Sequence, residues 1–228
     1  MTETSYAGLP TTPRDGGGPP DEPLRIAVIA ASVRDQRMGR AIAEWAAFRA
    51  VTIGTARNST DQSSTDQNSA DQNSAVTDVD LLDCAECDLP DDGLLRPGAG
   101  AGTAVSARID AADAFVFVTP EYNHSYPASL KRLIDWQYRE WMFKPATVLS
   151  YGVQGGLLAT EHLRGVLAEL HVVTTRRVVG LSRPWTDLSP SGYAPPADVA
   201  EAFDAALHEL TWWAALLRTA RHERPYAR

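Results

Sequence analysis

Cysteine and long apolar runs are both scarce in this sequence. Its 228 residues include two cysteines, which are too few for the disulfide framework of a secreted scaffold. No stretch approaches the ~20 consecutive apolar residues of a membrane-spanning helix. The N-terminal residues lack the basic start and apolar run of a secretory signal. We therefore expect a cytoplasmic protein with no membrane partner.

Basic residues are fewer than acidic ones. The chain carries 21 Lys and Arg residues against 29 Asp and Glu residues, so its formal net charge is −8 at pH 7. An excess of negative charge repels the phosphate backbone of nucleic acid, and we expect no nucleic-acid partner. Any anionic ligand must instead be met by a local cluster of cations and hydrogen-bond donors.

Three motifs that bind nucleotides or metals are also absent. The chain lacks G-x-x-x-x-G-K-[ST], which argues against an NTPase, and G-x-G-x-x-G, which argues against a Rossmann dehydrogenase. It lacks the zinc motif H-E-x-x-H as well. Cys84 and Cys87 have no second C-x-x-C or paired histidines that would complete a metal site. We therefore predict no metal.

Two segments lack the apolar residues that a folded core needs. Residues 1–23 are rich in Gly, Pro, Thr and Asp, which predicts a disordered tail. Residues 55–75 contain the tandem units DQSST, DQNSA and DQNSA and no Leu, Ile, Val, Phe, Met or aromatic residue. Such a segment cannot bury enough surface to offset the entropy cost of ordering, so we predict a disordered insertion. Residues 24–221 are otherwise expected to form a single domain.

Strand and helix patterns alternate five times along this domain. The predicted strands are apolar runs at 24–31, 76–83, 114–119, 146–152 and 171–179. The predicted helices follow them, from about residue 39 and then at 102–112, 127–141, 158–170 and 197–220. Alternation of this kind indicates an α/β fold whose parallel sheet has helices on both faces. A doubly wound sheet of five strands has the order 2-1-3-4-5.

This strand order predicts where a ligand binds. Ligands of such sheets lie beyond the carboxyl ends of the strands, near the point where the strand order reverses. The loops that follow strands one, three and four are loop one (residues 32–39), loop three (residues 120–126) and loop four (residues 150–156). Their residue content is the most unusual in the chain, and we expect them to surround one ligand.

Loop one offers groups that suit a phosphate. It contains Ser32, Arg34 and Arg37 before a predicted helix start near Gly39. Backbone N–H groups at a helix start carry partial positive charge, and guanidinium groups form charge-assisted hydrogen bonds to phosphate. A solvated loop with two surface arginines is the alternative. A single phosphate seat fits a mononucleotide.

Loops three and four offer surfaces that suit a flat ring. Loop three presents Glu, Tyr, Asn and His at residues 121–124, and Pro127 follows in a position suited to opening a helix. An aromatic face with nearby backbone and amide groups can pack against a heterocycle and bond to its edge. Loop four adds Tyr151 and glycines that allow close approach of the backbone to a ligand. Glycines of an ordinary turn are the alternative.

Three stretches together resemble the NADPH-dependent FMN reductase family. They are AASVRDQRMGRAIAEW, TPEYNHSYPASLKRLIDW and SYGVQGGLLATEHLR, and the similarity extends over residues 24–179 apart from the insertion. The resemblance implies a flavodoxin-like fold, FMN as the cofactor and NAD(P)H as the electron donor. It also implies a homodimer, or a tetramer, with the flavin near the subunit interface.

The resemblance assigns roles to residues by position. The family's phosphate loop falls on Ser32, Arg34, Arg37, Met38 and Gly39. Its ring-packing segments fall on Pro120, Glu121, Tyr122, Asn123, Ser150, Tyr151 and Gly152. On the substrate side we expect His124 and Tyr126. The family usually has glycine where this chain has Ala31 and Ser125. We name no catalytic residue, because the flavin carries out the chemistry.

The expected function is that of an FMN-dependent NAD(P)H oxidoreductase. It passes a hydride through FMN to a small acceptor, which is a quinone, a flavin, an azo compound or a nitro compound. The alternative is an FMN-binding electron carrier or redox sensor that acts through a protein partner without NAD(P)H turnover. Trp136 and Tyr138 lie off the apolar stripe of their predicted helix, which favours a subunit interface. Additional core beneath the C-terminal segment explains these two residues equally well.

Overall fold

A parallel sheet forms the centre of the fold. The computed structural model describes residues 22–60, 76–96 and 102–226, and its main sheet has the order β2-β1-β3-β4-β5. A further strand, β6, also pairs with β4. The predicted strand order is confirmed. The strands are β1 (Leu24–Ala30), β2 (Val76–Asp83), β3 (Ala114–Pro120), β4 (Pro145–Gly152), β5 (Val173–Thr174) and β6 (Val179–Ser182).

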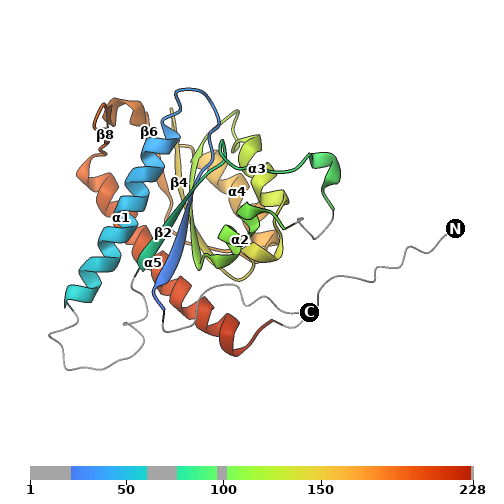
Figure 1. The fold of residues 1–228 in the computed structure, drawn as a ribbon. Coiled ribbons are helices and arrows are strands. Elements are labelled where there is room, and N and C mark those ends of the chain that lie inside the picture. The colour runs from blue at the N-terminus through green and yellow to red at the C-terminus, as the bar shows by residue number, and fades with distance from the viewer. Residues whose placement is uncertain (1–21, 61–75, 97–101, 227–228) are drawn as a thin grey trace.

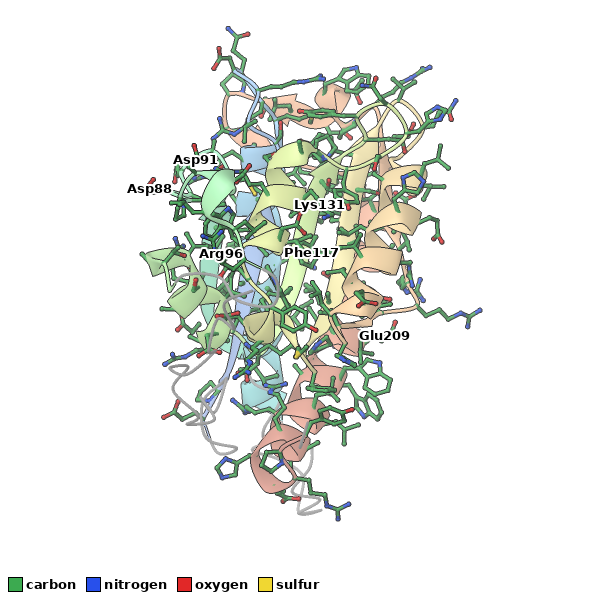
Figure 2. All side chains as sticks on the ribbon, turned by 90° about the vertical axis from the view of Figure 1, so that its right-hand side faces the viewer. Asp88, Asp91, Arg96, Phe117, Lys131 and Glu209 are labelled. Atoms are coloured by element: carbon green, nitrogen blue, oxygen red, sulfur yellow. The ribbon has the colours of Figure 1, made fainter. Side chains whose placement is uncertain are left out.

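Helices cover both faces of this sheet. One face carries α1 (Gly39–Thr60) and α5 (Ala197–Glu223), and the other carries α2 (Ala104–Ala111), α3 (Ala128–Asp135) and α4 (Leu157–Glu169) (Figure 1). Figure 2 views the second face, with Lys131 labelled on α3. Among the described residues, no helix is long and apolar enough to cross a membrane. The short elements are η3 (Asp92–Leu94), η4 (Arg139–Trp141), η5 (Pro184–Asp187), β7 (Leu188–Ser189) and β8 (Gly192–Tyr193).

The two faces of the sheet bury alternate residues of each strand. In β3, Val116 and Val118 belong to the core beneath α1 and α5, whereas Phe115 and Phe117 belong to the core beneath the other three helices. Successive side chains of a strand point to opposite faces, so a strand that is covered on both sides must be apolar throughout. Burial of each phenylalanine stabilises the fold by roughly 1.5–3 kcal/mol.

The fifth strand differs from its prediction. The single strand expected at 171–179 is replaced by β5 and β6, which pair with opposite ends of β4. Between them, the Arg164 guanidinium donates to the carbonyl oxygens of Thr175 and Arg176 at 2.7 and 3.1 Å, which satisfies these carbonyls outside the sheet ladder. β6 then continues to Ser182, three residues beyond the predicted end. The chain that follows β6 is therefore brought to the carboxyl end of β4.

The helix predicted at 127–141 is shorter in the structure. α3 ends six residues before the predicted end, and η4 forms a separate turn. Trp136 is buried and donates from Nε1 to an Asp92 carboxylate oxygen at 3.0 Å. Trp141 is also buried, with its ring centroid 4.8 Å from that of Phe115. Packing of the two indoles overrides helical propensity here. Because Trp136 is buried within the subunit, it contributes no exposed aromatic surface to an interface.

Most of the two segments predicted to be disordered lies outside the described residues. This holds for residues 1–21 and 61–75, whose disorder stays a prediction. Residues 55–60, which the prediction assigned to the insertion, are instead the last residues of α1. Glu22 and Pro23, assigned to the tail, accept hydrogen bonds from Arg218 through their carbonyl oxygens at 2.5 and 3.3 Å.

A cluster of buried charges lies at the amino ends of β3 and β4. Asp113 accepts hydrogen bonds from Arg218 and Arg221 at 3.3 and 3.1 Å. Lys144 is buried, and its Nζ donates to the carbonyl oxygens of Ile109 and Asp110 at 2.9 and 2.7 Å. Burial, and to a lesser degree repulsion from Arg221, lowers the pKa of Lys144 to about 7. A neutral amine still has enough hydrogens for both carbonyl oxygens.

We expect Lys144 to make stability depend on pH. Its pKa is about 7 in the folded protein and about 10.4 in an unfolded chain. The unfolded state therefore binds more protons between these values. The free energy of unfolding then rises with pH by at most about 1.4 kcal/mol per pH unit. Urea unfolding at pH 7, 8 and 9 measures this rise, which Lys144→Met should lose.

The control is Lys131→Met, which removes an exposed lysine from an i, i+4 pair with Asp135. This variant should keep the slope of the wild type. A slope that is the same in Lys144→Met and in the wild type would show that Lys144 titrates as an ordinary lysine.

Candidate functional site

Loops one, three and four meet at one end of the sheet, as predicted (Figure 1). β1 pairs with β3 and β3 pairs with β4, all in parallel, so the carboxyl ends of these strands are neighbours. The Ser129 hydroxyl donates to the carbonyl oxygen of Ala31 at 2.6 Å, which joins the start of α3 to loop one. The Glu121 N–H donates to the carbonyl oxygen of Tyr151 at 2.9 Å, which joins loop three to loop four.

Tyr122 links loop three to loop one. Its hydroxyl lies 2.7 Å from Ser32 Oγ, and the guanidinium carbon of Arg34 lies 3.7 Å from the centroid of its ring. The negative face of a phenol ring attracts a cation held over it. Ser32 is buried and Arg34 is exposed. Within the described residues Arg34 has no carboxylate partner, so its charge is not neutralised.

Arg37 differs from Arg34, although both were predicted to serve a phosphate. Its Nη2 donates to a carboxylate oxygen of Asp83 at 2.8 Å, and this hydrogen bond raises the pKa of Arg37. Asp83 is fully buried at the end of β2 and also accepts a hydrogen bond from Arg40. Arg37 Nε is buried and has no hydrogen-bond partner in the part of the chain that the structure describes. Sequence reasoning missed Asp83, because pairing of β1 with β2 brings it to loop one.

The start of α1 packs closely against Tyr151. The Met38 carbonyl accepts the first hydrogen bonds of the helix, including one from Ile42 at 3.1 Å. A Cβ atom at Gly39 would lie 2.5 Å from the Tyr151 hydroxyl, so only glycine leaves room for this ring. Tyr151 is buried in the core beneath α1. Burial raises the pKa of Tyr151 far above its ordinary value, and the phenol therefore stays neutral.

Loop three turns through a tight two-residue hairpin. Tyr122 and Ser125 exchange two backbone hydrogen bonds of 2.7 and 3.0 Å. Between them Asn123 and His124 have φ values of 50° and 66°, the left-handed conformation that such turns require. Both of these residues are exposed. The turn therefore fixes the direction of the backbone groups at residues 122–125.

Glu121 has a structural contact that its predicted role did not include. Its carboxylate accepts hydrogen bonds from the N–H groups of Leu158 and Ala159, at 3.1 and 3.4 Å, in the first turn of α4. A carboxylate at a helix N-terminus is stabilised by unpaired N–H groups and by the helix dipole. Pro120, the residue before it, is the last of β3 and pairs with Tyr151. Loop three is thus held to α4 as well as to β4.

Loop four turns sharply between β4 and α4. Ser150 is buried, and its hydroxyl donates to the carbonyl oxygen of Gly155 at 2.8 Å. Gly155 and Gly156 have φ values of 80° and 73°. A Cβ atom at Gly156 would lie 2.8 Å from the Tyr151 nitrogen. These two glycines are thus required by the turn itself. Gly152 lies beside loop three, where an added Cβ would be 3.6 Å from Glu121 Cβ.

The two residues predicted on the substrate side differ in exposure. His124 is exposed at the tip of the loop three turn, whereas Tyr126 is half-buried against the core beneath α3. Burial raises the pKa of Tyr126. His162 of α4, which the sequence analysis did not single out, lies with Nδ1 3.1 Å from Ser125 Oγ. No motif marks His162, because only the packing of α4 beside loop three brings it there.

The two cysteines are free thiols beside the apolar core. Cys84 and Cys87 are free and pack against the core beneath α2. Burial raises the pKa of the Cys84 thiol and also that of Cys87, so neither is a ready nucleophile. Across residues 22–60, 76–96 and 102–226, no group of three or more His, Cys, Asp or Glu residues is arranged to hold a metal ion.

Comparisons with known proteins find a family model and relatives that match this chain. The family model described as NADPH-dependent FMN reductase matches residues 24–186. An NAD(P)H-dependent FMN reductase of Saccharomyces cerevisiae is 36% identical over 156 residues, which cover 63% of this chain and 73% of that protein. One from Schizosaccharomyces pombe is 33% identical over 173 residues, covering 76% and 80%.

Solved structures show the same α/β fold. The flavoenzyme NAD(P)H:(acceptor) oxidoreductase from Paracoccus denitrificans superposes with a TM-score of 0.58 at 20% identity, covering 84% of this chain and 97% of that one. The fold is therefore flavodoxin-like. Because the family model spans most of the described domain, this chain belongs to the NADPH-dependent FMN reductase family and is an oxidoreductase.

Proposed function

We propose that this protein is an FMN-dependent oxidoreductase that takes a hydride from NAD(P)H and passes it to a small acceptor. The observation that carries this proposal is the contact of loop three with loop one through Tyr122, beside the start of α1. A helix start with uncompensated cationic charge suits a phosphate. A rigid turn next to it suits a flat heterocycle. FMN has both parts.

The residues of loop one fit the phosphate of FMN. Arg37 Nε is buried without a partner, and Arg34 carries a charge that no described carboxylate neutralises. The described side-chain partners of Ser32 are the neutral hydroxyls of Tyr122 and Tyr151. A phosphate would replace such neutral contacts with charge-assisted hydrogen bonds. Met38 and Gly39 are assigned to the same seat because they form the helix start.

Loops three and four fit the ring of FMN. Pro120 and residues 121–123 are held by the hairpin and by the Glu121 contact to α4, so their backbone groups are fixed before a ligand arrives. Residues 150–152 are fixed by the Ser150 hydrogen bond and by pairing of β4 with β3. Bound FMN would supply the ring that takes a hydride from NAD(P)H and passes it to the acceptor. The chain has to bind and orient that ring, and none of its side chains needs to act as an acid or base.

The surroundings of loop four favour a flat apolar acceptor. Val153 and Leu157 are exposed by 61% and 53%. Exposed apolar groups beside a polar site favour ligands with an apolar ring. We assign a quinone as the first choice, with flavins, azo compounds and nitro compounds as further acceptors. His124 and Tyr126 are the residues that we assign to substrate contact.

We also propose that the subunit forms a homodimer, with a tetramer as a possible higher assembly. A groove of about 460 Å³ between α3 and α4 is lined by apolar atoms of Ile134, Tyr138, Val166 and Leu170. An apolar groove between two helices suits a self-complementary contact. Sedimentation velocity should show a dimer for the wild type and a monomer for Val166→Glu. A wild type that is monomeric at micromolar concentration contradicts the assignment.

Arg34→Ala should weaken FMN binding by about tenfold, because one charge-assisted hydrogen bond to a phosphate is lost. Quenching of flavin fluorescence during titration measures the Kd. Riboflavin, which lacks the phosphate, should bind the variant as it binds the wild type. Arg177→Ala removes another exposed arginine and serves as the control. Equal losses of FMN and riboflavin affinity in Arg34→Ala would place the phosphate elsewhere.

Anaerobic mixing with NADPH or NADH tests the reaction itself. The yellow colour of the FMN-loaded protein should bleach within seconds, and a quinone added afterwards should restore it. A colour that persists for minutes with both donors refutes the reductase. That outcome would favour the electron carrier or redox sensor that acts through a protein partner.

A further inference from the structure

The segment after β6 is fastened to loop four. β6 pairs with β4 up to the register Gly152–Ser182. The Arg183 N–H then donates to the carbonyl oxygen of Gly152 at 2.8 Å, and the Ser182 hydroxyl donates to that of Val153 at 3.0 Å. Gly180 lies so close to Gly155 that an added Cβ would be 2.9 Å from its carbonyl oxygen. Arg183 is thus held beside the proposed ring site by strand pairing.

Arg183 has an unusual backbone conformation. Its φ and ψ are 50° and 47°, in the left-handed region, and Pro184 follows it. Left-handed backbone is unfavourable for a residue with a side chain, and the residue before a proline disfavours helical values. Such a conformation persists only where the surroundings determine it, and these positions cluster at functional sites. The hydrogen bonds of the Arg183 N–H and the Ser182 hydroxyl to loop four hold the backbone in this conformation.

The guanidinium of Arg183 is uncompensated. The residue is exposed, and no carboxylate pairs with it in the described part of the chain. Trp185, two residues further on, is 50% exposed at η5. An exposed cation and a half-exposed indole therefore lie two residues apart where β6 ends, beside the end of β4. Together they offer a phosphate contact and a stacking surface for a purine.

An acidic protein needs a local cation to bind an anionic electron donor. The chain has a net charge of −8, which repels an anionic donor at long range. The arginines of loop one are assigned to the FMN phosphate, and Arg37 is already paired with Asp83. The pyrophosphate of a nicotinamide dinucleotide then needs a separate partner near the ring. Arg183 has no carboxylate partner among the described residues, and its N–H is bonded to the backbone of loop four.

We propose that Arg183 binds the pyrophosphate of NAD(P)H and that Trp185 packs against its adenine. This inference rests on the proposed function. We choose the pyrophosphate because NADH and NADPH both contain it. It also lies closer to the nicotinamide than the 2′-phosphate of NADPH does. Segment 183–185 is then a donor-binding element that the acceptor does not need.

Steady-state kinetics of Arg183→Ala and Arg183→Gly test the assignment. Glycine accepts the left-handed backbone, so Arg183→Gly separates loss of the guanidinium from backbone strain. Both variants should raise the KM for NADPH and for NADH by about tenfold, because a charge-assisted hydrogen bond is lost. The kcat and the KM of the quinone should not change. Arg177→Ala is the matched control and should leave every constant unchanged.

A donor without phosphate isolates the effect. N-benzyl-1,4-dihydronicotinamide carries the reacting ring but no pyrophosphate or adenine, so both Arg183 variants should use it as well as the wild type does. An equal loss with this donor would show that Arg183 acts on the ring site, which overturns the proposal. A loss confined to NADPH would identify a 2′-phosphate contact and overturn the pyrophosphate assignment.

Binding of ADP-ribose provides a readout that does not depend on turnover. Calorimetry should show binding to the wild type that weakens about tenfold in Arg183→Gly and weakens with added salt. Trp185→Ala should weaken ADP-ribose binding further, and Trp185→Phe should retain it. A wild type that binds no ADP-ribose overturns the inference whether or not the enzyme turns over. A wild type that binds it but reduces no flavin refutes the proposed function and leaves this site standing.

Discussion

Parallel pairing of β1, β3 and β4 is the constraint on which the rest of this structure depends. These strands are covered on both faces, so most of their residues are apolar, and the polar loops of the site lie where each strand stops. Because the three strands pair in parallel, their carboxyl ends lie at the same edge of the sheet. Loops that are distant in sequence then become neighbours. The site lies at this edge because the covered faces of the sheet are filled mainly by apolar side chains.

Most polar side chains at this edge of the sheet contact groups of the protein itself. Tyr122 reaches Ser32, Glu121 reaches the first turn of α4, and Tyr151 fills the space that Gly39 leaves open. Each contact joins one loop to another loop or to a helix, so movement of one loop is opposed by its neighbours. A flavin enzyme requires this kind of rigidity, because the cofactor carries out the bond changes and the protein contributes orientation. Glu121, which could be taken for an acid or base, has a structural partner instead.

Charge in this protein is arranged locally. The net charge is strongly negative, yet the edge of the sheet contains Arg34, Arg37 and Arg183. Asp83 neutralises Arg37, because a buried carboxylate at the end of β2 requires a cation beside it. Arg34 and Arg183 have no such described partner. Because exposed charges are screened beyond about 10 Å, two local cations can bind anions despite the overall charge.

The sequence by itself determined the strand order, the edge at which the loops meet and the family. Each of these follows from local patterns: apolar runs six to nine residues long, the turn residues between them, and three motifs. Disorder at 61–75 and the roles of individual site residues stay predictions. Tertiary structure decided the rest. Trp136 and Trp141 ended α3 early, since burying an indole outweighs helical propensity. Arg164 bonds to the backbone between β5 and β6, and pairing of β6 with β4 places Arg183 beside loop four. Asp83 pairs with Arg37. No pattern within the sequence records these contacts, because each joins residues that only folding brings together.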